Sequence, residues 1–312
     1  MAVEPVGGLD REALEGFYTD SRTVELILDP VVGSFDVAHL KEINRRIFQD
    51  LPGRGFVDVT PGQFRPAIPE GRDWMKSRAL STQPGSFFVA YSRMDAAAQE
   101  RLAKVLESVS PVVLRELQTA DFVMAMAKLY TELDYAHPYS DGNSRTLRVF
   151  TQQLAGESGY QLDWEQFAVN DTGRDLLYIA RDKSVNHLAK PHMQHEHSLL
   201  KIIQTEARVA HCRDLADLLR DVVRPLRAIA FESMPQADAL LAHPDLATAY
   251  KTLDMAARQF GVSAPGNPQA QHAALDLVSA HIQKRLNDGE THDFKPPQLR
   301  QRVPTALGKS RG

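Results

Sequence analysis

A short segment, HPYSDGNSRTLR at residues 137–148, constrains the fold more than any other part of the chain. Before it, apolar residues recur at intervals of three and four, as in a helix with one buried face: Phe122, Met126, Leu129 and Leu133. The same spacing returns after it at Leu147, Phe150 and Leu154. Pro138 and the turn-forming residues 140–143 disfavour helical geometry between the two stretches. The sequence therefore predicts two helices joined by a tight loop, with the second helix beginning at about Asn143.

Helical spacing dominates the rest of the chain, and the predicted fold class is mainly α. Residues 36–51, DVAHLKEINRRIFQDL, carry another apolar stripe and predict a further core helix. The exception is PGSFFVAYSR at residues 84–93, where a Pro-Gly pair opens a short β-rich run. This run predicts a strand or hairpin at the surface, with a packed connector as the alternative.

The character of the chain changes near residue 190. A histidine-rich connector, HLAKPHMQHEH, lacks the helical pair of histidines with an acid that a zinc protease needs, so we interpret it as a solvated linker. Three amphipathic helical segments follow it. We expect a first domain over residues 1–190, a helical accessory or interaction domain over 191–290, and a basic flexible tail over 291–312.

Composition narrows the class of protein. Hydrophobic residues make up 43% of the chain and the formal net charge is −4, which predicts a globular protein without a general affinity for nucleic acid or membranes. The single cysteine, Cys212, fits a reducing cytosol. The N-terminus has acids where a signal peptide has a basic start, and no run reaches transmembrane length. We expect a cytoplasmic protein, with later export through a C-terminal signal left open.

The loop at residues 137–148 has the parts of an anion site. A loop that enters a helix N-terminus exposes unpaired backbone amides at the positive end of the helix dipole. Gly142 and Asn143 allow the unusual backbone angles that such a nest requires. Arg145 and Arg148 lie three positions apart, so both guanidinium groups can converge on phosphate oxygens.

Two further residues add chemistry to this anion site. Asp141 supplies a hard oxygen ligand for a Mg²⁺ ion shared with the phosphates. His137 can accept a proton from an attacking hydroxyl near neutral pH. The residues alone leave two interpretations open: a nucleotidyl or phosphoryl transfer site, or a helix-capping Asp-Gly-Asn turn with surface arginines.

The segment resembles the signature of Fic-domain proteins of the Fic/DOC family, HPFx(D/E)GNGRxxR. Seven positions match it in register: His137, Pro138, Asp141, Gly142, Asn143, Arg145 and Arg148. Residues 33–66 are similar to the upstream Fic helix and loop, and residues 157–167 to the segment after the active-site helix. The resemblance covers roughly residues 15–190 and implies a helical Fic core with a short β-hairpin flap.

The resemblance implies transfer of AMP from ATP to a hydroxyl side chain of a target protein. His137 would deprotonate the hydroxyl, and Asp141 would hold Mg²⁺. The nucleotide-binding residues would be Gly142, Asn143, Ser144, Arg145 and Arg148. The flap, at Ser86, Phe87, Phe88 and Val89, would dock the target segment by strand pairing.

Three departures from the family pattern affect this interpretation. Tyr139 replaces the usual Phe and brings a hydroxyl that needs a partner. Ser144 replaces the second motif Gly, which would cost about 1 kcal/mol or more if that position needs a positive φ. Asn44 stands where many relatives have His, and LPGRG at residues 51–55 replaces an aromatic-Ala-Gly loop. The nucleotide donor is therefore less constrained than phosphate binding.

Many Fic proteins carry an inhibitory glutamate in the pattern (S/T)xxxE(G/N). Ser21–Glu25 comes nearest, but Leu26 follows it, so we interpret the match as coincidence. The sequence favours a separate small antitoxin chain that supplies the glutamate, or no inhibitor. We expect a bacterial toxin or translocated effector. The alternatives are a Fic enzyme with another nucleotide or phosphodiester donor, and a catalytically weak relative that acts as an interaction module.

Overall fold

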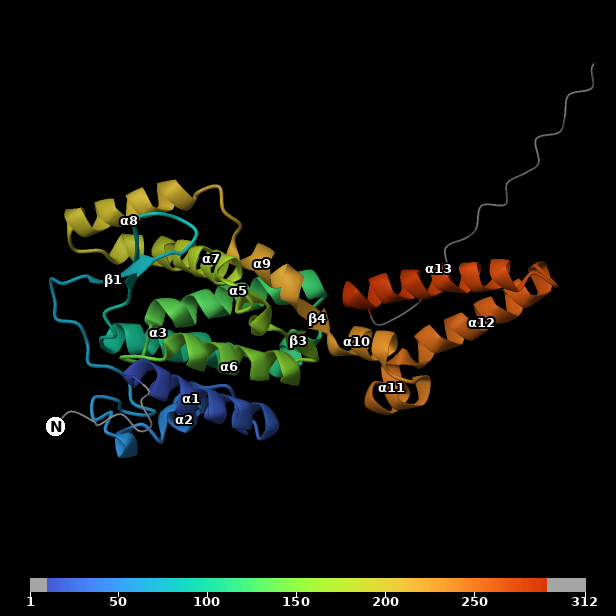
Figure 1. Ribbon diagram of the computed structural model, residues 1–312, viewed down its shortest axis with the longest axis horizontal. Helices are drawn as coiled ribbons and strands as arrows, with labels where there is room; N and C mark the ends of the chain where they lie inside the picture. The colour runs from blue at the N-terminus through green and yellow to red at the C-terminus, as the bar shows by residue number, and fades with distance from the viewer. Residues whose placement is uncertain (1–9, 291–312) are drawn as a thin grey trace, which may run out of the picture. The chain divides into compact units, whose positions relative to one another are not determined.

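The computed structural model describes residues 10–290, which divide into two compact units (Figure 1). The first unit extends to Leu226 and the second begins at Arg227. Helices of the first unit are α1 (Arg11–Leu28), α2 (Val37–Phe48), α3 (Ala96–Glu107), α4 (Pro111–Arg115), α5 (Thr119–Ala136), α6 (Asn143–Glu157), α7 (Asp171–Ala189), α8 (Glu196–Val209) and α9 (Leu215–Val222), with single 3₁₀ turns at Pro52–Arg54, Trp164–Phe167 and Lys190–His192. The prediction of a mainly α fold is confirmed.

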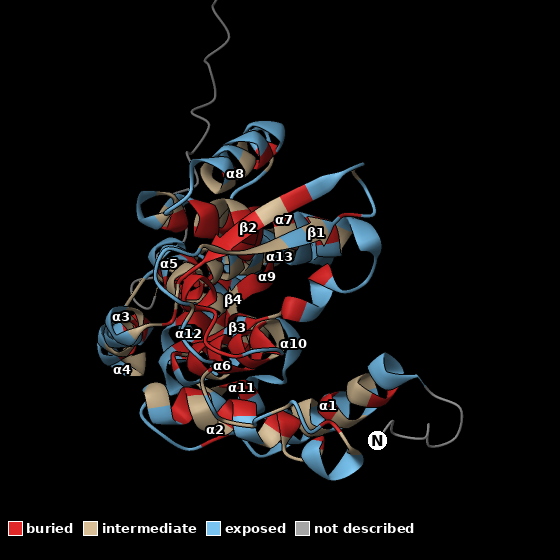
Figure 2. Ribbon diagram, turned by 90° about the vertical axis from the view of Figure 1, so that its left-hand side faces the viewer, coloured by how far each residue is buried: buried red, intermediate tan, exposed pale blue. Residues whose placement is uncertain are grey.

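The helices of the first unit form layers around α5 and α6. On one side α2 packs against α6 and carries α1, and on the other α7 packs against α5 and carries α8 (Figure 1). The apolar stripes predicted from the sequence face this interior, and Figure 2 colours much of α5 and α6 as buried. Phe122, Leu133, Leu147 and Phe150 have no exposed surface. Burial of such stripes is the main favourable term in folding. It fixes the two helices that flank the loop at residues 137–142.

Two small antiparallel sheets complete the first unit. Strand β1 (Trp74–Ala79) pairs with β2 (Ser86–Tyr91), and β3 (Tyr160–Leu162) pairs with β4 (Val223–Pro225). The β-rich run at residues 84–93 supplies the predicted strand, β2, while its partner β1 precedes the run and completes a hairpin. Its second strand is the inner one, because β2 packs on α7 and α8.

Side chains of α7 and α8 occupy the outer backbone edge of β2. Asn186 accepts from the Ala90 amide at 3.0 Å and donates to the Phe88 carbonyl at 3.0 Å, while the Thr205 hydroxyl accepts from the Phe88 amide. Strand β1 has β2 as its one strand neighbour within residues 10–290. The edge of the hairpin that is open to another strand therefore belongs to β1.

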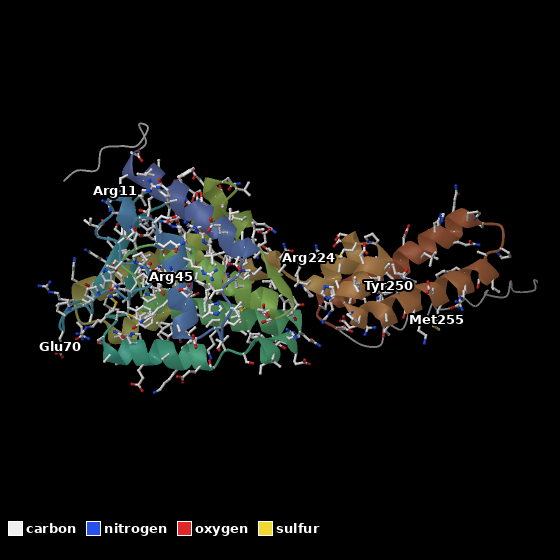
Figure 3. All side chains as sticks on the ribbon, turned by 90° about the horizontal axis from the view of Figure 1, so that it is seen from below. Arg11, Arg45, Glu70, Arg224, Tyr250 and Met255 are labelled. Carbon is white, nitrogen blue, oxygen red and sulfur yellow. The ribbon has the colours of Figure 1, made fainter. Side chains whose placement is uncertain are left out.

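The second unit consists of α10 (Leu226–Ser233), α11 (Gln236–Ala242), a 3₁₀ turn (Pro244–Leu246), α12 (Ala247–Ser263) and α13 (Pro268–Asn287). Its core lies where α12 packs on α13 and includes the buried Leu246 and Ile282. Tyr250 and Met255, labelled on α12 in Figure 3, lie on opposite sides of this packing, since Tyr250 is buried against Phe231 and Met255 is exposed.

The division between the units falls at a different place from the boundary predicted near residue 190. Helix α8 packs on β2 and α7, and α9 packs on α5 and α7, so both belong to the first unit. The predicted tail at 291–312 lies outside the described residues. Within the described part of the chain, no helix combines the length and apolar composition needed to cross a bilayer.

The Asn186 contact gives a test of the hairpin. Replacing Asn186 by Ala removes its two hydrogen bonds to the β2 backbone, and we expect the free energy of unfolding to fall by about 1–3 kcal/mol. Urea denaturation of the purified chain measures this change. The exposed Lys128→Ala on α5 is the control, expected within about 0.5 kcal/mol of the parent. Equal stability of the two variants would contradict the assignment of Asn186.

Candidate active site

Two residues with left-handed backbone angles shape the loop between α5 and α6. His137 ends α5 with φ 44° and ψ 60°, and Gly142 precedes α6 with φ 71°. A Cβ atom on Gly142 would lie 1.9 Å from the Phe48 ring, so only glycine fits there. Arg65 donates through Nε to the His137 carbonyl at 2.8 Å and through its amide to the Pro138 carbonyl. The Phe48 ring and the hydrogen bonds from Arg65 therefore both restrict the conformation of the loop.

Asn143 and Tyr139 hold the inside of this loop. The Asn143 amide group accepts from the Tyr139 N–H at 2.9 Å and donates to the Tyr139 carbonyl at 2.7 Å. The Tyr139 hydroxyl donates to the Leu40 carbonyl at 3.0 Å, which gives it the partner that this departure from the family pattern requires. The Asn143 side chain is thus engaged in hydrogen bonds within the loop. Asn143 can therefore contribute to anion binding through its backbone N–H.

The first turn of α6 has no side-chain cap. Other helices of the first unit are capped by aspartates: Asp10 for α1, Asp36 for α2 and Asp95 for α3. Gly142 at the corresponding position of α6 has no side chain to accept these amide hydrogens, and the first helical bond runs from Thr146 to the Gly142 carbonyl. The amides of residues 143–145 are thus available to an anion.

His137 lies almost fully buried at the end of α5, with 6% of its surface exposed. Its ring stacks on Tyr91 at 3.8 Å between centroids and meets Trp74 edge-on at 5.1 Å. Nδ1 lies 3.6 Å from Asp134 Oδ1, and Nε2 lies 3.1 Å from Lys76 Nζ. Burial lowers the pKa of His137 to about 4, against the opposing effect of Asp134. The imidazole is therefore neutral at pH 7 and Nε2 is available as a proton acceptor.

A buried ion pair stands behind His137. Arg181 of α7 binds both carboxylate oxygens of Asp134 at 2.9–3.0 Å, and its Nη1 donates to the Ser144 hydroxyl at 3.0 Å. Burial alone would raise the pKa of Asp134, but Arg181 and His137 hold it below its ordinary value. Asp134 is therefore ionised and faces the Nδ1 side of the base. This favours the tautomer with its proton on Nδ1.

Ser144 does not carry the backbone strain considered from the sequence. It lies within α6, and among described residues other than glycine a positive φ occurs at Phe35, Met94 and His137. The left-handed residue next to the start of α6 is Gly142 instead. Asn44, which stands where many relatives have His, donates to the Thr146 hydroxyl and accepts from the Gly62 amide. It therefore fixes the loop that contains Gly62.

His137, the loop and both motif arginines line one cavity of about 270 Å³. Arg145 is held by Glu15 and the Thr19 hydroxyl of α1 and lies over the Phe48 ring. Arg148 donates through Nε to the Ser144 carbonyl at 3.3 Å. The other cationic side chains of the lining are Lys76, Arg78 and Arg181. The structure thus gathers the predicted phosphate ligands in one place and adds three cations to them.

Asp141 lies at the mouth of this cavity and also lines a neighbouring one of about 340 Å³. Its Oδ1 accepts from the Gly142 amide at 2.6 Å, which leaves Oδ2 for a ligand. Residues 10–290 contain no group of three or more acidic, histidine or cysteine side chains placed to hold a metal. One exposed carboxylate fits an ion such as Mg²⁺ only if phosphate oxygens complete its coordination.

The predicted flap residues lie on β2, but two of the four are buried in the interior. Phe87 and Val89 are buried, Phe88 is half-buried and Ser86 is exposed. Because Asn186 and Thr205 occupy the β2 edge, strand pairing with a target at these residues is blocked. Pairing by β1 remains open to the same kind of segment.

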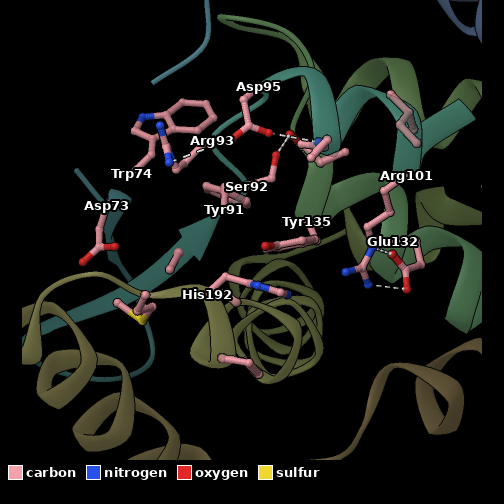
Figure 4. A pocket seen from close by; sticks show the side chains of 18 of the residues that line it. Asp73, Trp74, Tyr91, Ser92, Arg93, Asp95, Arg101, Glu132, Tyr135 and His192 are labelled. Atoms are coloured by element: carbon pink, nitrogen blue, oxygen red, sulfur yellow. Dashed lines mark hydrogen bonds and ion pairs between the residues drawn. The ribbon is translucent and has the colours of Figure 1, made fainter. Parts of the chain in front are cut away.

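A second cavity, of about 350 Å³, lies beside the hairpin (Figure 4). It shares Tyr91 with the site, and Figure 4 shows Tyr135 and His192 close together with the Arg101–Glu132 ion pair beyond them. His192 belongs to the histidine-rich segment interpreted as a linker. The cavity has no base paired with a nucleophile, and we assign it no chemistry.

Comparison with known proteins agrees with this geometry. The model of the Fic/DOC family matches residues 34–155, a stretch that includes α2, the hairpin and the loop between α5 and α6. "Protein adenylyltransferase VbhT" of Bartonella schoenbuchensis is 27% identical over 157 residues, which are 50% of this chain and 28% of that protein. "Probable protein adenylyltransferase y4lH" of Sinorhizobium fredii is 26% identical over 49% of this chain and 67% of that protein. The chain thus spans little more than a quarter of the Bartonella relative.

Two solved structures are also similar at low identity. The ADP-bound N-terminal Fic domain of a VirB-translocated Bep effector protein from Bartonella quintana is 20% identical, with a TM-score of 0.47, over 70% of this chain and 89% of that one. BepC from Bartonella tribocorum, with bound AMPPNP, is 16% identical, with a TM-score of 0.44, over 68% of this chain and 85% of that one.

Sequence reasoning missed several residues of the site. Asp134 could have been found, because it precedes His137 by three positions on the same helix face. Lys76, Arg181 and Glu15 are brought to the site only by tertiary packing, and no local pattern marks them.

The low pKa of His137 gives a test through stability. In the unfolded chain the pKa of this histidine is near its ordinary value of 6.5, whereas in the folded chain its pKa is about 4. The unfolded state therefore binds more protons between these values, and stability falls as the pH drops from 6.5 to 4. In His137→Gln this loss should be smaller by up to about 3 kcal/mol.

Urea unfolding at pH 7 and pH 4 measures the difference. His39, whose pKa burial also lowers, contributes equally to parent and variant and cancels. If the two proteins lose the same stability, His137 is not buried in its neutral form.

Proposed function

We propose that this chain is a protein adenylyltransferase that moves AMP from ATP to a tyrosine, threonine or serine hydroxyl of a target protein. The observation that carries the proposal is the single cavity that joins a neutral buried histidine, the uncapped amides of α6 and the arginines Arg145 and Arg148. The matching family and the names of the two relatives support the same reaction.

The site residues divide the reaction between them. His137 Nε2 accepts the proton of the target hydroxyl as its oxygen bonds to the α-phosphorus, and the bond from that phosphorus to the pyrophosphate breaks. The α6 amides and the two arginines hold the phosphates and stabilise the charge that moves onto the leaving group. Asp141, with the phosphates, would hold Mg²⁺, which neutralises phosphate charge when bound.

The target segment would dock on the free edge of β1. A strand added at this edge forms main-chain hydrogen bonds whatever its own sequence is. Every second side chain of β1 faces the site. Trp74 and Lys76 both contact His137, so a hydroxyl residue paired with this strand would lie beside the base. This replaces the docking on Ser86–Val89 expected from the sequence.

We further propose a role as a bacterial toxin or translocated effector, with the helices of the second unit as an interaction module. A separate antitoxin chain and export through the C-terminal residues belong to the same proposal. The antitoxin and the export process would each act on a catalytic unit that has been made and folded in a cytoplasm.

Incubation with labelled ATP, GTP or UTP, Mg²⁺ and a bacterial lysate tests the activity. We expect transfer of label from ATP to a protein, with a loss of about 10²-fold or more in His137→Ala. Label from another nucleotide would assign a different donor to the same site. Absence of transfer from every nucleotide, with folded protein, would refute the proposed reaction and favour an interaction module.

The ion pair between Glu15 and Arg145 suggests how phosphate binding at Arg145 is limited within the chain. Ser21–Glu25, the nearest match to the inhibitory pattern and interpreted from the sequence as coincidence, does not reach the site, since Glu25 pairs with Arg22 at 2.6 Å and is exposed. Glu15, on the same helix, binds Arg145 directly. A phosphate that uses Arg145 must compete with this carboxylate, and a negative charge beside the phosphates weakens their binding.

Replacing Glu15 by Gln should therefore tighten triphosphate binding, by about fivefold to tenfold. Isothermal titration calorimetry with a non-hydrolysable ATP analogue and Mg²⁺ measures the affinity. Glu25→Gln is the matched control, because it removes the same charge from the same helix away from the cavity. Unchanged or weaker binding in Glu15→Gln would mean that the Glu15 contact positions Arg145 and does not compete with phosphate.

A further inference from the structure

Lys76 occupies the place at the base where the acceptor hydroxyl must arrive. Its Nζ lies 3.1 Å from His137 Nε2, the nitrogen that receives the proton in the proposed reaction. The side chain is half-buried and lines the cavity together with its alternate neighbour Arg78, while Trp74 on the same strand meets the His137 ring. An ammonium donates three hydrogen bonds and accepts none, so it cannot replace His137 as the base while charged.

The charges that line the cavity separate into paired and unpaired cations. Arg78 binds Asp182 at 2.7 Å, Arg145 binds Glu15, and Arg181 binds Asp134. Lys76 and Arg148 form no ion pair with a carboxylate of residues 10–290. Asp141 is the one carboxylate among the described lining residues. Two cations that form no ion pair, in a partly buried cavity with one exposed carboxylate, favour an anionic ligand.

The positions of these two cations indicate which phosphate each would take. In the proposed transfer, the target oxygen lies between Nε2 and the α-phosphorus, so a group that touches Nε2 is also next to that phosphorus. Lys76 is such a group. Arg148 lies one turn into α6, beyond the amides that receive the phosphates, where the distal phosphates would extend.

We propose that Lys76 is a catalytic residue that binds the α-phosphate. Its ammonium leaves Nε2 when the target hydroxyl arrives and donates to a non-bridging oxygen of the α-phosphate. There it stabilises the charge of the transferring group, while the bond to the target oxygen forms, the bond to pyrophosphate breaks and the hydroxyl proton passes to His137. Lys76 keeps its own protons throughout. Its role in transfer rests on the proposed function, whereas its contact with the α-phosphate does not require turnover.

Binding of two nucleotides to folded protein tests the phosphate contact without any reaction. AMP carries only the α-phosphate, and a non-hydrolysable ATP analogue carries all three. We expect Lys76→Met to weaken both about tenfold, and Arg148→Met to weaken the ATP analogue about tenfold but AMP less than about twofold. Arg72→Met removes a charge from an exposed residue two positions before β1 and is the control, expected to change neither affinity. Thermal unfolding checks that each variant is folded.

Steady-state transfer then separates chemistry from binding. With saturating nucleotide, Lys76→Met should lower kcat about 10²-fold, and Lys76→Arg should recover a large part of it, because an arginine also donates to phosphate. If Lys76→Met binds AMP as tightly as the parent, the α-phosphate contact is refuted. A rise in KM for the target alone would then assign Lys76 to target docking. If the parent shows no transfer but Lys76→Met loses AMP affinity, the phosphate contact holds and only the proposed reaction fails.

Discussion

The ion pair between Asp134 and Arg181 connects the parts of the site that come from different helices. Asp134 lies on α5 beside the base, and Arg181 reaches from α7 to the first turn of α6 through Ser144. Both side chains are almost completely buried, so removal of one partner would leave an uncompensated charge in the interior at a cost of several kcal/mol. The positions of His137 and the anion-binding turn are therefore fixed by the same buried charges.

This arrangement explains why so many cations can line one small cavity. Arg78, Arg145 and Arg181 each have a carboxylate partner, so their charges are offset before any ligand binds. Their guanidinium groups shape the walls. The amides of α6, Lys76 and Arg148 remain free of acidic partners within the described residues. A site built in this way favours an anion, because these donors can bind it without first breaking an ion pair.

The local features of the fold could be predicted from the sequence, and the contacts between distant segments could not. The spacing of Phe122 and Leu133 placed α5, and Gly142 with Asn143 placed the start of α6, because periodicity and turn chemistry act over a few residues. Arg145 meets Glu15 from 130 positions away, and Asn186 binds a strand almost a hundred positions earlier. The first amphipathic segment predicted after residue 190 contains most of α8, but an apolar stripe does not identify the surface that covers it.

Ser144 illustrates how a departure from a family motif is accommodated. Its position requires no left-handed backbone, because that conformation falls on Gly142, where the Phe48 ring excludes any side chain. The added hydroxyl is bound by Arg181, which already holds Asp134, so it gains a charged donor without disturbing the ion pair. Ser144 therefore ties the first turn of α6 to the residues that orient His137. The departure adds a connection within the site while leaving the helix amides open to an anion.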